Sequence, residues 1–181
     1  MHCWKTLNLK HQFGTTRIFI MASCVFILIF TSSFVLLNLL HQEQFTDRYF
    51  WLFVLVTLLL YPMHKLFHFI ALFDLRKQVT FRIRIQYLFI PVINLRIREP
   101  IRKKRYLLVL LTPFILINFF IIAFTVYFPA YTHYGTLLLS YHCSLCLVDI
   151  LYVKYLLHSP KEAYIEETPK GYEILVPHTV G

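Results

Sequence analysis

Four long apolar blocks constrain the fold of this chain more than any other feature of its sequence. They cover residues 18–40, 49–73, 106–129 and 134–157, and each is longer than the roughly 20 residues that a helix needs to cross a bilayer. Hydrophobic residues make up 58% of the 181 positions and charged residues 15%, against roughly 25% charged in soluble proteins. The sequence therefore predicts an all-α polytopic membrane protein, with four transmembrane helices in one membrane domain.

Basic residues are distributed unevenly, which predicts a topology. Ten of the 18 Lys and Arg residues lie between positions 76 and 105, three precede the first block, and the two remaining loops hold one and none. By the positive-inside rule, both termini and the loop 74–105 are expected in the cytoplasm. The net charge of the chain is +9. Because basic segments beside a membrane contact anionic lipid headgroups, we expect its basic residues to bind the lipid surface and not nucleic acid. No organelle signal is evident, so a bacterial plasma membrane is expected.

The loop 74–105 differs from the blocks around it, because its pattern is that of strands. Apolar and polar residues alternate strictly over 79–86, which is typical of a half-exposed strand, and residues 90–98 repeat the alternation more weakly. We expect a small cytoplasmic β-hairpin whose arginines face headgroups or solvent. The polar tail 158–181 favours a further short strand at 172–176, whereas residues 1–17 carry no motif.

The inner end of the second block carries a candidate metal site. His64 and His68 are four residues apart, so both lie on one face of a helix, and this spacing suits a divalent metal ion. Pro62 precedes them and is expected to kink the helix, which favours a small polar cavity. The zinc-protease pattern H-E-x-x-H is present in outline, but Lys65 occupies the position of its glutamate.

Asp149 in the fourth block is the third candidate ligand. It is the fifteenth residue after Tyr134, as His64 is the fifteenth after Tyr49. At 1.5 Å per residue both lie about 22 Å from the outer ends of their spans. Two histidines and a carboxylate form a catalytic zinc set that leaves one position for water. His64, His68 and Asp149 are therefore the predicted ligands of a Zn²⁺ ion.

The same residues allow other interpretations. Cys146 shares a helical face with Asp149 and is a substitute ligand, whereas His142, about 10 Å nearer the outside, is expected to be a poor partner for His64. Cys143 and Cys146 also suit a packed span as small residues. The two histidines and the aspartate could form a metal-free polar cluster in which they satisfy one another, or could be packed there incidentally.

These segments together resemble the DUF3267 family of membrane zincins, whose layout is related to that of the site-2 proteases. The resemblance covers most of the chain from the second span onward. It implies that His64, His68 and Asp149 bind zinc within the membrane, and that a glutamate at position 65 activates the bound water to attack a peptide bond. The segments that carry it are residues 61–68, the basic strand-like loop, and residues 103–106, 111–114, 147–150 and 167–172.

Lys65 departs from that family pattern, and the functional prediction depends on it. A glutamate beside the metal accepts the proton of the water, which a lysine cation cannot do unless burial removes its own proton. Lys65 could instead pair with Asp149 and replace the metal. Loss of a general base costs roughly 10²–10⁴ in rate. A second departure is Val148, where family members tend to have glycine.

We therefore expect a catalytically impaired pseudoprotease that binds membrane-protein segments or other partners through its inherited cleft. One alternative is an active intramembrane zinc metallopeptidase with an unusual base. Another, from a different class, is a small transporter or channel component in which His and Asp line a path for protons or metal ions. Four spans without an inverted repeat disfavour that alternative.

Overall fold

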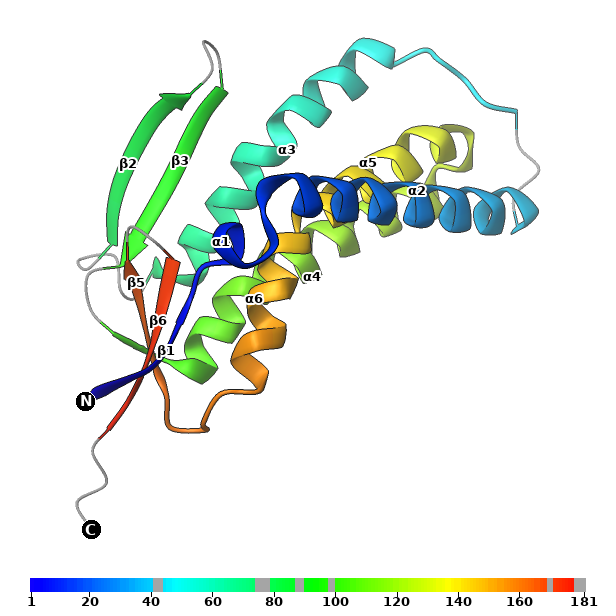
Figure 1. The fold of residues 1–181 in the computed structure, drawn as a ribbon. Helices are drawn as coiled ribbons and strands as arrows, with labels where there is room; N and C mark the ends of the chain where they lie inside the picture. Colours follow the sequence, from blue (N-terminus) through cyan, green and yellow to red (C-terminus); the bar gives the residue numbers. More distant parts are fainter. Residues whose placement is uncertain (41–43, 74–78, 87–89, 98–99, 169–170, 178–181) are drawn as a thin grey trace.

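The computed structural model describes residues 1–40, 44–73, 79–86, 90–97, 100–168 and 171–177, with only the backbone described at Lys10 and over 79–86 and 90–97. Helices form a tilted group at one end of the molecule, and a small sheet that carries both chain termini lies at the other (Figure 1). In the described residues the molecule is mostly helical with two antiparallel sheets, so the all-α prediction is too narrow.

Long apolar helices occupy the predicted blocks. Three are long and apolar enough to cross a membrane: α2 (Thr15–Leu40), α3 (Phe50–Ala71) and α4 (Lys103–Tyr127). The fourth block, predicted as one span, is a pair of shorter helices that bend by 46° at a break, namely α5 (Thr132–Leu145) and α6 (Leu147–Leu157). The described residues thus contain three such helices, or four if the bent pair counts as one span.

The break lies at Cys146, between α5 and α6. The Cys146 amide still donates to the His142 carbonyl (3.0 Å), and the Cys146 carbonyl accepts from Ile150 (2.9 Å), so Cys146 keeps a helical hydrogen bond on each side of the change of direction. Pro62, where a kink was expected, lies inside α3, and Pro113 lies inside α4; each helix continues through its proline.

The expected hairpin is confirmed, and a second sheet accompanies it. Strands β2 (Val79–Gln86) and β3 (Ile90–Ile97) pair antiparallel, with Val79 opposite Ile97; the directions of their arginine side chains lie outside the described residues. The second sheet has the order β1-β6-β5-β4. Its strands are β1 (His2–Leu7), β6 (Gly171–Val176), β5 (Tyr164–Thr168) and β4 (Ile101–Arg102).

The N-terminal segment, for which the sequence predicted no strand, belongs to this second sheet. Residues 1–17, which carry no motif, form β1, the short helix α1 (Leu9–Phe13) and the start of α2. The pairing of β1 with β6 joins the two ends of the chain, which local patterns cannot reveal. Gly171 permits the close approach: its φ is +142°, and a Cβ there would meet the Leu7 carbonyl. The predicted strand 172–176 is confirmed as β6.

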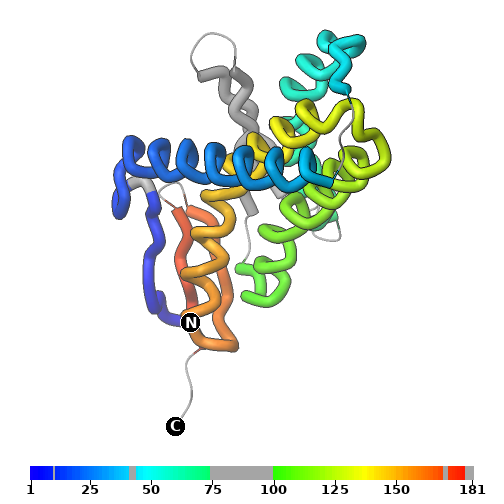
Figure 2. Tube along the Cα trace, turned by 90° about the vertical axis from the view of Figure 1, so that its right-hand side faces the viewer, coloured from blue at the N-terminus to red at the C-terminus, as the bar shows by residue number. Residues whose placement is uncertain are grey.

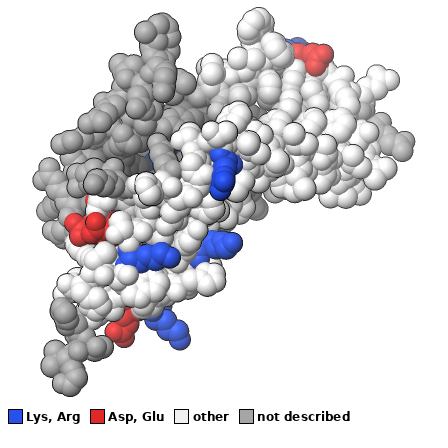
Figure 3. All heavy atoms as spheres, viewed as in Figure 1, with Lys and Arg blue, Asp and Glu red and all other residues white. Residues whose placement is uncertain are grey.

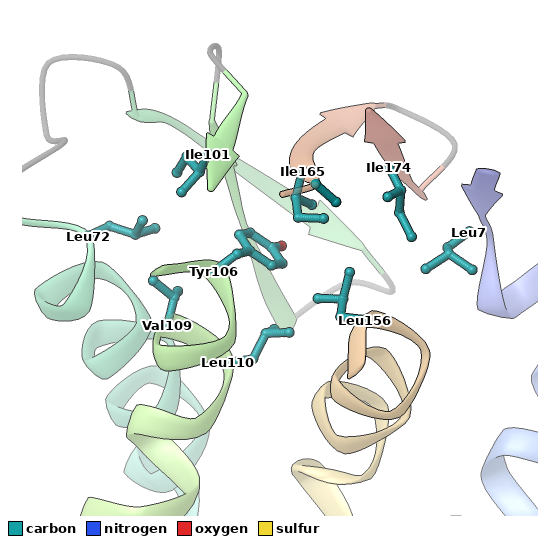
Figure 4. Packing of buried hydrophobic residues seen from close by; sticks show 10 residues of the cluster. Leu7, Leu72, Ile101, Tyr106, Val109, Leu110, Leu156, Ile165 and Ile174 are labelled. Atoms are coloured by element: carbon teal, nitrogen blue, oxygen red, sulfur yellow. The ribbon is translucent and has the colours of Figure 1, made fainter. Parts of the chain in front are cut away.

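A hydrophobic core joins the four-stranded sheet to the helices. Leu7 and Ile174 come from neighbouring strands, while Leu110 and Leu156 come from α4 and α6, and all are nearly or fully buried (Figure 4). A second, smaller cluster lies farther along the helices, where Leu60, Ile117, Ile121 and Leu138 bring α3, α4 and α5 together. The site described below lies on the same helices.

The outer faces of the helices are apolar. On α2 the side chains of Phe19 and Leu39 are 71% and 75% exposed, and on α3 that of Trp51 is 81% exposed. One face of α2 packs along α5, and the helices cross as seen in Figure 2. In the view of Figure 3 charged side chains gather mainly toward the sheet, and the helical part is nearly free of them except near its far end.

Candidate metal centre

Two histidines of α3 and one aspartate of α6 converge inside the helical part. His64 and His68 are 3% and 6% exposed, because both lie on the face of α3 that packs toward the other helices. Asp149 lies in the first turn of α6. Its Oδ2 is 3.1 Å from His64 Nε2 and 3.4 Å from His68 Nε2, and the two Nε2 atoms are 3.1 Å apart.

These three distances match the edges of a tetrahedral zinc site. With zinc bonds of 2.0–2.1 Å to nitrogen and oxygen, neighbouring ligand atoms are separated by about 3.3 Å. The three donors of His64, His68 and Asp149 are already at that spacing, each from a side chain that is buried or nearly so. The residues present therefore fit a Zn²⁺ ion with a fourth position left over.

A hydrogen bond on the far side of the His68 ring determines which nitrogen faces the site. Its Nδ1 lies 2.9 Å from the backbone carbonyl of Val109 on α4. Because a carbonyl oxygen can only accept, Nδ1 must carry the proton. In the neutral ring Nε2 then presents a lone pair toward Asp149 and His64, which is the tautomer that binds a metal.

A longer chain of contacts determines which nitrogen of His64 carries the proton. Asn118 on α4 directs its amide nitrogen at the sulfur of Cys143 (3.6 Å) and its Oδ1 at Nδ1 of His142 (2.7 Å). His142 therefore donates from Nδ1, and its Nε2 is free to accept. Nδ1 of His64 lies 3.2 Å from that Nε2 and is the donor. Nε2 of His64 then carries no proton.

The consequence is a buried point where three acceptors meet without a hydrogen between them. Two imidazole lone pairs and a carboxylate oxygen, from His64, His68 and Asp149, face one another at 3.1–3.4 Å. Such an arrangement requires a cation, either a metal ion or an additional proton on a ring. The hydrogen bonds around the rings thus favour a metal ion over neutral hydrogen bonding within the cluster.

His142 contradicts its expected position. It was expected about 10 Å nearer the outside than Asp149, and hence away from His64, but it is fully buried and contacts the His64 ring. The reason is that the two nitrogens of His64 face opposite ways. One reaches Asp149 on α6, and the other reaches His142 on α5, across the bend.

Cys146 and Lys65 are also placed by the structure. The Cys146 sulfur lies 3.7 Å from Nδ1 of His64, on the ring edge opposite Asp149, so it does not replace that carboxylate. Lys65 is half-buried and within Coulombic range of His64 and Asp149. The described ion pairs of Asp149 are with the two histidines, so the alternative of a Lys65–Asp149 pair is not observed.

Asn118 is a site residue that the sequence did not identify as one. The sequence offered one signal, an amide in the middle of an apolar block, where an unpaired polar group would be costly. Its role depends on the positions of His142 and Cys143, which belong to another helix.

An apolar pocket lies along α3 beside the cluster. Its volume is about 770 Å³, and its walls come from α3, α4 and α5 and the loop between the last two. Met63 and Phe67, which line it, neighbour His64 and His68 in the sequence, so the pocket reaches the part of α3 that holds the ligands. Other lining residues include Phe53, Ile117, Phe124 and Leu138.

The model of the DUF3267 family, described as "Putative zincin peptidase", matches residues 57–164, which is more than half of the chain and includes both histidines and Asp149. Searches of curated proteins and of solved structures gave no match.

Proposed function

Because the chain belongs to the DUF3267 family, we propose that it is a membrane-embedded, zincin-like protein that binds zinc but is impaired as a peptidase. The observation that carries this proposal is the convergence of His64, His68 and Asp149 at zinc-ligand spacing, next to a lysine in the position of the general base.

Exposed apolar surface supports the membrane assignment. Contiguous apolar faces as long as those of α2, α3 and α4 would be unfavourable in water, whereas a bilayer accommodates them. The sheet would lie at the cytoplasmic surface, as the positive-inside rule requires. There the exposed Arg102 and Lys104 at the start of α4 would contact anionic headgroups. Lys103 would not, because it is 8% exposed and donates to the carbonyls of Leu157 and Ser159.

Zinc binding is supported by the ligands and by the groups around them. His64, His68 and Asp149 would hold the ion, while the Val109 carbonyl and His142 keep the two rings oriented. A bound zinc would supply a Lewis acid and a water whose pKa is lowered toward neutrality. Buried orienting partners of this kind raise metal affinity.

Lys65 explains why peptide hydrolysis would be weak. A general base accepts the proton of the attacking water, and a lysine ammonium has no lone pair with which to accept one. Its charge also acts on the same point as the metal, since it is within Coulombic range of His64 and Asp149. Loss of the base would lower the rate by roughly 10²–10⁴.

The apolar pocket supports a binding role that does not need catalysis. We infer that it takes an apolar transmembrane segment of a partner protein, because its lining is apolar along α3 and α4 and it adjoins the part of α3 that holds the ligands. A segment bound there would lie beside His64 and His68 in a water-poor environment.

Metal analysis of the full chain purified in detergent tests the zinc assignment. About one zinc per chain is expected in the wild type. His64→Ala should lower that value severalfold, and so should Asp149→Asn in a Cys146→Ala background that lacks the neighbouring thiol. His158→Ala, on an exposed residue whose ring contacts a backbone carbonyl, should not. Wild-type protein that binds no zinc when the ion is supplied would end the proposal.

A cleavage assay separates the pseudoprotease from an active peptidase. Zinc-loaded wild type, incubated with apolar transmembrane peptides in detergent or liposomes, is expected to yield no cleavage above a His64→Ala/His68→Ala control. Robust zinc-dependent cleavage by the wild type would replace the present proposal with an active intramembrane metallopeptidase that uses another base.

A further inference from the structure

A second set of donors lies on the other edge of the His64 ring. We propose that His64 Nδ1, His142 Nε2 and Cys146 Sγ form a second metal site, distinct from the site at Asp149, that binds a thiophilic ion such as Zn²⁺ or Cu⁺. All three residues are buried, and His142 and Cys146 are fully so.

The spacing of the three atoms fits such an ion. The two nitrogens are 3.2 Å apart, and the sulfur lies 3.7 Å from His64 Nδ1 and 3.5 Å from His142 Nε2. For tetrahedral zinc, with bonds of 2.0–2.1 Å to nitrogen and 2.3 Å to sulfur, the expected edges are about 3.3 Å between nitrogens and about 3.6 Å between nitrogen and sulfur. All three observed edges are within about 0.2 Å of these values.

The bend of the fourth apolar segment produces this set. His142 and Cys146 are four residues apart, so both face one side of the helical path, and the change of direction at Cys146 turns its sulfur toward α3. Asn118 fixes His142 with its proton on Nδ1, which leaves Nε2 as a lone pair facing the site.

Metal binding at this set releases the thiol proton of Cys146 and changes the tautomer of His64. The ion forms one bond to sulfur and two to nitrogen; the thiol proton of Cys146 leaves to solvent, as thiolate ligation requires. The proton on His64 Nδ1 also leaves that atom, and Nε2 of the same ring takes up a proton that it donates to Asp149, 3.1 Å away. One ring can thus serve either site while its other edge is satisfied by a hydrogen bond.

The two donor sets differ in the metals that they favour. The set at Asp149 has two nitrogens and a hard carboxylate oxygen, whereas the second set replaces the oxygen with a sulfur, which selects softer ions. Because only His64 is shared, each site can be loaded when the other has been removed. This property separates the proposed site from a role of Cys146 as a substitute ligand in a single site.

Cobalt binding to the full chain in detergent tests the second site. Co²⁺ bonded to a thiolate gives a near-ultraviolet charge-transfer band that nitrogen and oxygen ligands do not give. The wild type and Asp149→Asn should show this band, and Cys146→Ser and His142→Ala should lose it. Cys24→Ser, on an exposed cysteine of α2, should retain it as the matched control. Absence of the band in the wild type, its persistence in Cys146→Ser, or its loss in Asp149→Asn would each overturn the proposal.

A measurement on unmodified protein covers the case in which Cys146→Ser does not fold. X-ray absorption of wild type loaded with two equivalents of zinc should include a sulfur shell at about 2.3 Å. A spectrum with nitrogen and oxygen scatterers only would reject the second site and leave the first intact. Failure of the zinc assignment at Asp149 would be seen separately, as equal zinc contents of Cys146→Ala and Cys146→Ala/Asp149→Asn.

Discussion

Nδ1 of His64 lies 3.2 Å from Nε2 of His142, although the two residues belong to different apolar blocks and helical rise alone predicts different depths for them. This contact connects Asn118 through His142 to the nitrogen that faces Asp149. The orientation of a predicted metal ligand is therefore set by residues of two other helices.

Replacing Asn118 should weaken zinc binding without removing a ligand. Asn118→Leu deletes the acceptor that holds the proton on His142 Nδ1, so the lone pair of His64 Nε2 is no longer fixed toward the site. Loss of such an orienting partner typically lowers metal affinity 10–100-fold. Competition with a chelator measures the change. Asn38→Leu, on an exposed position of α2, is the control, and equal affinities of the two variants would contradict the orienting role.

Supplying a carboxylate at position 65 should create or increase peptidase activity. Lys65→Glu restores the group that accepts the proton of the attacking water, and we expect roughly 10²–10⁴ faster cleavage of apolar peptides than with Lys65→Gln. The Gln variant removes the same positive charge without providing a base. Comparable rates for the two variants would show that the lysine is not what limits catalysis.

A side chain at Gly135 should separate α4 from α5. A Cβ there would collide with the Thr125 side chain, and small residues at such contacts allow helices to approach closely. Overpacking of this kind costs about 1–3 kcal/mol, which thermal unfolding of Gly135→Ala in detergent should reveal. Combining it with Thr125→Ala should recover part of the loss; a double variant less stable than the sum of the two changes would argue against a direct collision.

Cys3, near the N-terminus, should react with a thiol reagent added from the cytoplasmic side. Cys3 is exposed on β1, and β1 pairs with the C-terminal strand β6. A membrane-impermeant maleimide should therefore modify Cys3 in inverted vesicles and not in intact cells. The opposite pattern is expected for Gln44→Cys in a Cys3→Ser background. Residue 44 is exposed, and the nearby Thr46 amide donates to the Ala130 carbonyl in the loop at the other end of the helices. Labelling of Cys3 in intact cells would contradict the assigned orientation.

Local patterns were enough to predict the parts of this protein that depend on local structure. The length of the apolar blocks predicted α2, α3 and α4. Alternation, strict over 79–86 and weaker over 90–98, predicted the hairpin of β2 and β3, and the tail pattern predicted β6. The four-residue spacing of His64 and His68 predicted two donors on one face of a helix. Counting helical rise placed Asp149 at the same depth, and its carboxylate contacts both rings.

The remaining features depend on contacts between residues far apart in the chain. The strand β1 exists as part of a sheet because β6 pairs with it from the other terminus. The bend at Cys146 brings His142 Nε2 and Cys146 Sγ close to His64. Counting 1.5 Å per residue assumes a straight helix and so does not include such a bend. Sequence by itself thus determined the three long helices α2, α3 and α4 and the spacing of the two histidines on α3. Only the tertiary structure decided which nitrogen of each ring faces the metal position. For His68 that depends on the hydrogen bond to the Val109 carbonyl, and for His64 on the contact with His142, whose own proton is held by Asn118.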